Sequence, residues 1–145
     1  MLAEGVSADR LIEIPFGVDL DRFRPTARQP ATRFRVAFAG QVSIRKGIPY
    51  LLEAWQQLGW TDAELWLIGR TTADFAAIYQ RWEHLVEQNK EHLVFLGLLR
   101  DPQKLANFYA MCDVFCLPSR SDCFPSVQVE AILSGTPLVS TDIPG

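Results

Sequence analysis

The sequence contains no long hydrophobic run. Its apolar stretches, such as residues 114–117, are far too short to span a bilayer. The amino terminus also lacks the basic region and apolar core of an export signal. We therefore expect a soluble protein in the cytoplasm.

Basic charge is not in excess either. The chain has 14 Lys and Arg against 17 Asp and Glu, a formal net charge of -3. A protein whose main task is to hold nucleic acid usually presents a strongly basic face. The balance therefore predicts that nucleic acid is not a partner.

Cysteine is scarce, and its three positions lie close together at Cys112, Cys116 and Cys123. An odd number in one stretch makes a poor disulfide framework and suits a reducing compartment. The paired C-x-x-C spacing of zinc modules is missing. We interpret these residues as small buried hydrophobes and expect no metal site.

The 145 residues are 48% hydrophobic and 21% charged, which is ordinary for one globular domain. Apolar runs ending at glycine alternate with stretches of helical periodicity. Strands are expected at 33–39, 64–68, 92–96, 114–117 and 137–140. Helices are expected at 48–58, from a cap at Asp74 through an apolar stripe to Val86, from Pro102 onward, and at 125–134. This alternation predicts an α/β fold, a Rossmann-like, doubly wound parallel sheet.

Residues 1–30 differ from the rest. Residues 12–16 are expected to be extended, and residues 17–25 form a turn-rich connector. We interpret 1–30 as an interdomain lead-in and 31–145 as the ligand-binding domain. The orphan connector and the stop directly after a fifth strand indicate a piece of a larger protein, truncated before its final elements.

Two loops should flank a ligand if the strands take the common order 3-2-1-4-5. Ligands in such sheets bind at the carboxyl ends of the strands, where the winding direction reverses. The first loop, residues 40–47 (GQVSIRKG), carries Arg45 and Lys46. The second, residues 118–125 (PSRSDCFP), carries Asp122 and leads into a helix N-terminus, which favours anions. Together they predict a phosphate site.

Glu130 lies about one turn into the following helix, among apolar residues. A carboxylate there costs free energy unless it accepts hydrogen bonds, and a ribose diol presents two donors. The alternative is a solvated or arginine-paired Glu130 with a purely structural role. The residues alone leave both interpretations open.

Other nucleotide motifs are missing. No G-x-G-x-x-G follows the first strand, and residues 40–47 lack the G-K-[ST] ending of a P-loop. The acidic pair Asp19 and Asp21 lies in the connector, where we expect a turn with solvated carboxylates rather than a metal site. His84 and His92 have no evident nucleophile partner and are expected to be structural.

Several motifs occur together in an order and spacing that are highly specific. They are IPFGVDLDRFRP, FAGQVSIRKGIPYLLEAW, ELWLIG, VFLG and CDVFCLPSRSDCFPSVQVEAILSGTPLVSTDIPG. Over nearly its whole length the chain resembles the C-terminal domain of retaining glycosyltransferases with two Rossmann domains (the GT-B fold), a family that includes sucrose synthases. The resemblance implies hexosyl transfer from a nucleoside diphosphate sugar without a metal or other cofactor. It also implies a missing N-terminal acceptor domain, an inactive isolated fragment, and peripheral membrane association of the full-length protein.

The resemblance also implies roles for individual residues. The family signature, two glutamates separated by seven residues, matches Asp122 and Glu130. Glu130 would hold the ribose and Asp122 the donor sugar, while Lys46 and Arg45 would neutralise the diphosphate. The remaining nucleotide contacts would come from Gly40, Gln41, Phe124, Pro125, the backbone N–H groups of Ser126 and Val127, and, near the base, Gly97 and Leu98.

The chain also departs from the family pattern. The first acid is Asp122 rather than Glu, Gln41 replaces a frequent arginine, and Cys123 and Pro125 replace frequent glycines. These departures motivate two alternatives to a transferase domain. One is a non-catalytic nucleotide-binding or interaction domain of the same fold, and the other is a nucleotide-sugar epimerase.

Overall fold

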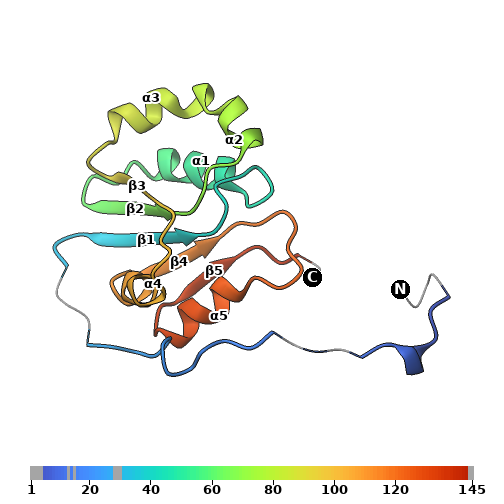
Figure 1. The fold of residues 1–145 in the computed structure, drawn as a ribbon. Helices are drawn as coiled ribbons and strands as arrows, with labels where there is room; N and C mark the ends of the chain where they lie inside the picture. The colour runs from blue at the N-terminus through green and yellow to red at the C-terminus, as the bar shows by residue number, and fades with distance from the viewer. Residues whose placement is uncertain (1–4, 13, 15, 28–30, 144–145) are drawn as a thin grey trace.

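The computed structural model describes residues 5–12, 14, 16–27 and 31–143. Five parallel strands form one sheet in the order β3-β2-β1-β4-β5 (Figure 1). The strands are β1 (Phe34–Ala39), β2 (Ala63–Ile68), β3 (Leu93–Gly97), β4 (Val114–Leu117) and β5 (Leu138–Ser140). This order confirms the expected Rossmann-like α/β sheet, with its reversal between β1 and β4.

Helices cover both faces of the sheet. On one face lie α1 (Ile48–Leu58), α2 (Ala73–Ile78) and α3 (Gln80–Gln88), and on the other lie α4 (Pro102–Ala110) and α5 (Ser126–Leu133) (Figure 1). Because both faces are covered, the central strand has side chains buried in both directions, and the last four residues of β1 are all buried. No helix in the described part of the chain is long and apolar enough to cross a membrane.

The segment between β2 and β3 differs from the expectation. The single helix expected there is two helices, α2 and α3, divided at Tyr79. The capping position is Thr72 rather than Asp74, because the Asp74 carboxylate instead accepts hydrogen bonds from the Ile44 N–H and the Thr72 hydroxyl. The apolar stripe nevertheless faces the core, and Phe75, Trp82, Leu85 and Val86 are buried.

The connector ahead of the sheet forms a turn, as expected. The Asp19 carboxylate accepts hydrogen bonds from the N–H groups of Asp21 and Arg22. Next to this turn, Phe23 is buried and packs edge-on against Tyr109. This contact ties the connector to the α4 side of the sheet.

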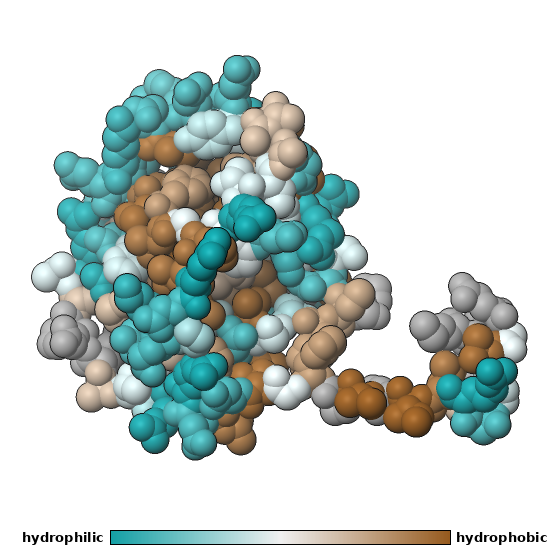
Figure 2. All heavy atoms as spheres, in the orientation of Figure 1, coloured by the Kyte–Doolittle hydropathy of each residue, from teal (hydrophilic) through white to brown (hydrophobic). Residues whose placement is uncertain are grey.

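The segment before that turn extends away from the sheet domain, and apolar surface runs along it in Figure 2. Its Ile12, Ile14 and Phe16 side chains are among the most exposed large hydrophobics of the described chain. The expected extended stretch at 12–16 also includes residues 13 and 15, which lie outside the described residues. The domain boundary at residue 30 stays a prediction.

Candidate functional site

A pocket of about 350 Å³ opens where β1, β2 and β3 end. We call it the crevice pocket, and its lining includes Gly40, Gln41, Arg70, Leu98, Leu99 and Val127. Four of these, Gly40, Gln41, Leu98 and Val127, are among the site residues expected from sequence. Arg70, an exposed cation just after β2, was missed, although its position directly after a strand-ending glycine is the signal that could have found it.

The two loops expected to flank the ligand lie against each other. Gly47 has φ of +73°, and a Cβ atom placed there would meet the Pro118 carbonyl oxygen at 1.8 Å. The same two loops are also joined by a backbone hydrogen bond, in which the Arg120 N–H donates to the Arg45 carbonyl at 2.8 Å. The Arg45 guanidinium in turn donates to the Ser121 carbonyl at 3.0 Å. Only glycine allows this close approach, which fixes one loop relative to the other.

Lys46 and Asp122 form an ion pair between these loops. The ammonium hydrogen-bonds directly to the Asp122 carboxylate, and the two side chains are only 11% and 12% exposed. The Ser119 hydroxyl lies 3.4 Å from the same carboxylate oxygen. The structure therefore brings two of the expected catalytic residues together, and it pairs them with each other.

Hydrogen bonds within the loop and from the start of α2 hold the loop that carries Lys46. The Lys46 N–H donates to the buried Ser43 hydroxyl at 3.1 Å. The Ile44 N–H donates to Asp74 at 3.1 Å, and the Thr72 N–H donates to the Val42 carbonyl at 3.1 Å. The hydrogen bond from Thr72 holds the pKa of Asp74 below its ordinary value, so Asp74 stays an anionic acceptor.

Glu130 has a partner that sequence reasoning missed. The Tyr109 hydroxyl donates to Glu130 Oε2 at 2.9 Å. Tyr109 is buried, and it contributes to the floor of the crevice pocket. Burial raises the pKa of Tyr109 far above its usual range, and the Glu130 charge adds to this effect. The partner of Glu130 is therefore a tyrosine rather than an arginine, and its role in binding ribose stays a prediction.

Asp122 lies at a second, smaller pocket of about 120 Å³. Its lining includes Ser119, Asp122, Cys123, Pro125 and Gln128. Two of the expected site residues, Asp122 and Pro125, thus line this Asp122 pocket, and four others line the crevice pocket. The ion pair with Lys46 lies beside the Asp122 pocket.

The other six expected site residues line neither of these two pockets: Arg45, Lys46, Gly97, Phe124, Ser126 and Glu130. Phe124 is exposed and its ring packs against Phe16, with centroids 5.5 Å apart. The Ser126 N–H donates to the Phe124 carbonyl at 3.0 Å, so this donor is already used within the chain. Gly97 ends β3 at φ of +67°, and its carbonyl accepts from the Gly69 N–H.

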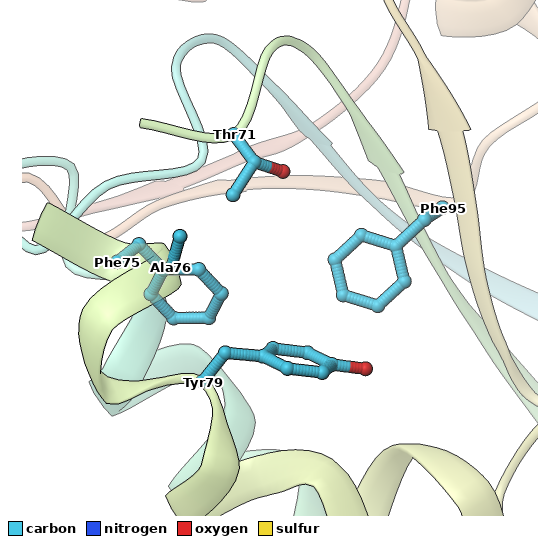
Figure 3. A pocket seen from close by; sticks show the side chains of 5 residues that line it. All are labelled: Thr71, Phe75, Ala76, Tyr79 and Phe95. Carbon is cyan, nitrogen blue, oxygen red and sulfur yellow. The ribbon is translucent and has the colours of Figure 1, made fainter. Parts of the chain in front are cut away.

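A third hollow, of about 440 Å³, is a different kind of site. Figure 3 shows the Phe75, Tyr79 and Phe95 rings around it, with Thr71 and Ala76 completing the lining. No charged side chain of the described residues lines this aromatic pocket, so its chemistry does not suit a phosphate. Among the described residues, no cluster of His, Cys, Asp or Glu is placed to hold a metal ion.

The sequence matches a family model and is similar to longer known proteins. The family model described as glycosyl transferases group 1 matches residues 33–145. The α-galactosylglucosyldiacylglycerol synthase of Streptococcus pneumoniae is 25% identical over 99% of this chain and 41% of its own length. The phosphatidyl-myo-inositol mannosyltransferase of Mycobacterium tuberculosis is 33% identical over 91% of this chain and 35% of its own. The chain therefore spans well under half the length of these relatives.

Solved structures share the fold. The Anabaena protein HepE in complex with UDP and glucose has a TM-score of 0.77 and 21% identity, over 96% of this chain and 40% of its own. Sucrose-phosphate synthase from Thermosynechococcus elongatus has a TM-score of 0.72 and 30% identity, over 88% and 34%. The C-terminal domain of LpcC from Francisella tularensis has a TM-score of 0.71 and 19% identity, over 86% and 70%.

Proposed function

This chain belongs to the group 1 glycosyl transferases, and we propose that it is the donor-binding part of a retaining enzyme that uses a nucleoside diphosphate sugar. The observation that carries the proposal is the meeting of Lys46 and Asp122 between two interlocked loops at the carboxyl ends of the strands. Such a crevice is where ligands bind in open α/β sheets.

In this proposal the crevice pocket takes the nucleoside. Leu98 and Leu99 offer apolar surface for the base, and Glu130 accepts hydrogen bonds from the ribose hydroxyls. The complex of HepE with UDP and glucose supports nucleotide binding by a chain of this fold. The base itself stays open, because backbone and aliphatic side chains discriminate bases weakly.

The diphosphate lies beside the nucleoside, close to the cations. Arg45 and Lys46 come from the first loop, and Arg70 follows β2 at the rim of the crevice pocket. Cations fixed before the reaction stabilise the negative charge that develops on a leaving diphosphate, and this needs no metal. Because Asp122 already accepts from Lys46, a bound diphosphate would share or replace that carboxylate as the partner of the ammonium.

The donor sugar is assigned to the Asp122 pocket. Its volume of about 120 Å³ is small, and Ser119 and Gln128 offer further polar groups there. Asp122 would accept hydrogen bonds from sugar hydroxyls after donor binding loosens its bond to Lys46. Retention of the anomeric configuration follows from the family resemblance and is part of the proposal.

The rest of the enzyme would supply the acceptor. The relatives named for a diacylglycerol glycolipid and for phosphatidyl-myo-inositol are much longer than this chain. By analogy with these relatives, we propose that an acceptor domain lies outside this sequence and that the acceptor is a lipid. We also propose that the whole protein attaches peripherally to the cytoplasmic side of a membrane. This chain alone would bind donor without turning it over.

Calorimetry on this chain tests the donor site. Wild type is expected to bind at least one of UDP, GDP and ADP, and Lys46→Ala and Glu130→Ala each to weaken binding by about tenfold or more, since each removes a charge-assisted hydrogen bond. Lys90→Ala and Glu87→Ala are matched controls, because these two exposed residues pair with each other at the end of α3. Unchanged affinity in the Lys46 and Glu130 variants would overturn the site assignment.

The reaction itself is tested with the full-length protein. The expected product is a glycosylated acceptor whose new linkage, observed by NMR, keeps the anomeric configuration of the donor. An epimerised sugar nucleotide without transfer would identify an epimerase. Binding of donor without either product would identify a non-catalytic domain.

A further inference from the structure

The Tyr109 hydroxyl is one of the most tightly positioned polar groups near the crevice pocket. Tyr109 is fully buried on α4, and its ring lies edge-on to Phe23, Phe108 and Phe115, with centroids 5.5 to 6.0 Å apart. Its carbonyl also accepts a hydrogen bond from the Thr136 hydroxyl at 2.8 Å. The connector, α4, β4 and the turn after α5 therefore all contribute to fixing this ring.

The Tyr109 hydroxyl donates a hydrogen bond to Glu130 Oε2 at 2.9 Å. A glutamate side chain has three rotatable bonds, and holding it in one orientation costs conformational entropy. A hydrogen bond from an immobile donor offsets that cost before any ligand arrives. It also occupies Oε2 and leaves Oε1 as the oxygen with most accepting capacity.

Tyr109 acts here only as a donor. Burial and the adjacent Glu130 charge keep the pKa of its hydroxyl far above the usual range, so the proton stays on the phenol. The bond to an ionised carboxylate is therefore charge-assisted, which makes it stronger and more directional than a neutral one.

We propose that Tyr109 is a positioning residue that orients the Glu130 carboxylate toward the ribose hydroxyls, and thereby sets the preference of the site for ribonucleotide over deoxyribonucleotide donors. The inference rests on the proposed function, because it requires Glu130 to contact the ribose. Although Tyr109 lines the crevice pocket, its hydroxyl donates to Glu130. Its effect passes through Glu130, as preorganisation of a binding group.

The test compares ribose recognition with overall affinity. Tyr109→Phe keeps the ring and its packing and removes only the hydroxyl. Calorimetry measures the affinity of UDP, GDP and ADP and of their 2′,3′-dideoxy analogues. The ribose preference of the site is the ratio of the affinity of the nucleotide that binds to that of its dideoxy analogue. In Tyr109→Phe this preference is expected to fall by about three- to tenfold, while the dideoxy analogue binds as it does to wild type. Tyr50→Phe, at an exposed tyrosine on α1, is the matched control.

A second variant leaves the core untouched. Glu130→Asp keeps the carboxylate but shortens the side chain by one methylene, which withdraws it from the fixed Tyr109 hydroxyl. Its ribose preference is expected to fall as in Tyr109→Phe, although the charge remains. Full ribose preference in Glu130→Asp would overturn the inference even if Tyr109→Phe failed to fold.

The remaining outcomes separate this inference from the proposed function. Equal losses for the ribonucleotide and its dideoxy analogue in a folded Tyr109→Phe protein would make Tyr109 purely structural and overturn the inference alone. Ribose preference that survives Glu130→Ala would remove Glu130 from the ribose site. The proposed function would then lose that assignment, and the inference would fail with it.

Discussion

Lys46 and Asp122 form one contact that, under the proposed function, would serve both folding and ligand binding. Their side chains are nearly buried, so each charge depends on the other for stabilisation. A bound diphosphate would offer Lys46 a second anion at the same place. The pair therefore competes with the ligand, and its two members should respond differently to substitution.

Asp122→Asn should raise the affinity of this chain for a nucleoside diphosphate by about three- to tenfold, because Lys46 would lose its competing carboxylate. The same change should lower sugar transfer by the full-length enzyme, since the proposed sugar contact is weakened. Calorimetry and a transfer assay measure the two effects. A fall in diphosphate affinity would mean that Asp122 supports the Lys46 position more than it competes for it.

The close contact between the two loops also depends on the backbone of Gly47. Gly47→Ala should destabilise the chain by more than about 2 kcal/mol, because the new Cβ combines a positive φ with a severe clash at Pro118. Gly59→Ala is the matched control. Its φ is also positive, but a Cβ there meets nothing within 4 Å, so only about 1 kcal/mol is expected. Urea unfolding measures both, and equal losses would contradict a close approach of the loops.

At the scale of elements, α2 supports the first loop as well as covering the sheet. Thr72 and Asp74 lie at its start, and both bind backbone groups of residues 42–44. The expected long helix is divided into α2 and α3, and the two helices make different contacts. The start of α2 is held to the loop, while α3 packs its apolar stripe on the core.

Asp74→Ala should therefore weaken nucleotide binding by about threefold to tenfold, although Asp74 is exposed and contacts no proposed ligand group. The reason is the lost acceptor for the Ile44 N–H, beside Arg45 and Lys46. Asp74→Asn is the matched control, because its amide oxygen can still accept that hydrogen bond. Calorimetry distinguishes the two, and identical binding by wild type and Asp74→Ala would show that the loop holds its shape without α2.

For the protein as a whole, Tyr109 affects stability at alkaline pH. The pKa of Tyr109 is raised far above its usual range in the folded chain and returns to about 10 on unfolding. Above pH 10 the unfolded state loses a proton that the folded state keeps. This contribution to stability is therefore complete below pH 10 and falls as pH rises beyond it.

Tyr109→Phe should lower the pH dependence of the unfolding free energy above pH 10 by up to about 1.4 kcal/mol per pH unit. Urea unfolding between pH 8 and 11 measures the slope. Phe108→Leu is the matched control, because it loosens the same cluster and keeps the hydroxyl. Parallel slopes for wild type and Tyr109→Phe would contradict a fully protonated, buried Tyr109.

The sequence alone determined the alternation of strands and helices, the five strands and the positions of the loops at residues 40–47 and 118–125. Those features follow from local signals, since apolar periodicity, glycines at strand ends and helix-opening prolines act within a few residues. The strand order then placed residues 40–47 and 118–125 at one crevice. The expected helix boundaries at 48–58 agree with α1.

Which side chains meet depends on the folded arrangement of distant segments. Lys46 and Asp122 are 76 positions apart, Ile44 and Asp74 are 30 apart, and Tyr109 and Glu130 are 21 apart. No local pattern encodes such pairs, because they depend on loop geometry and side-chain packing after the sheet has formed. For the same reason the sequence could name Glu130 as a candidate ribose ligand, whereas the tyrosine that holds it appeared only in the fold.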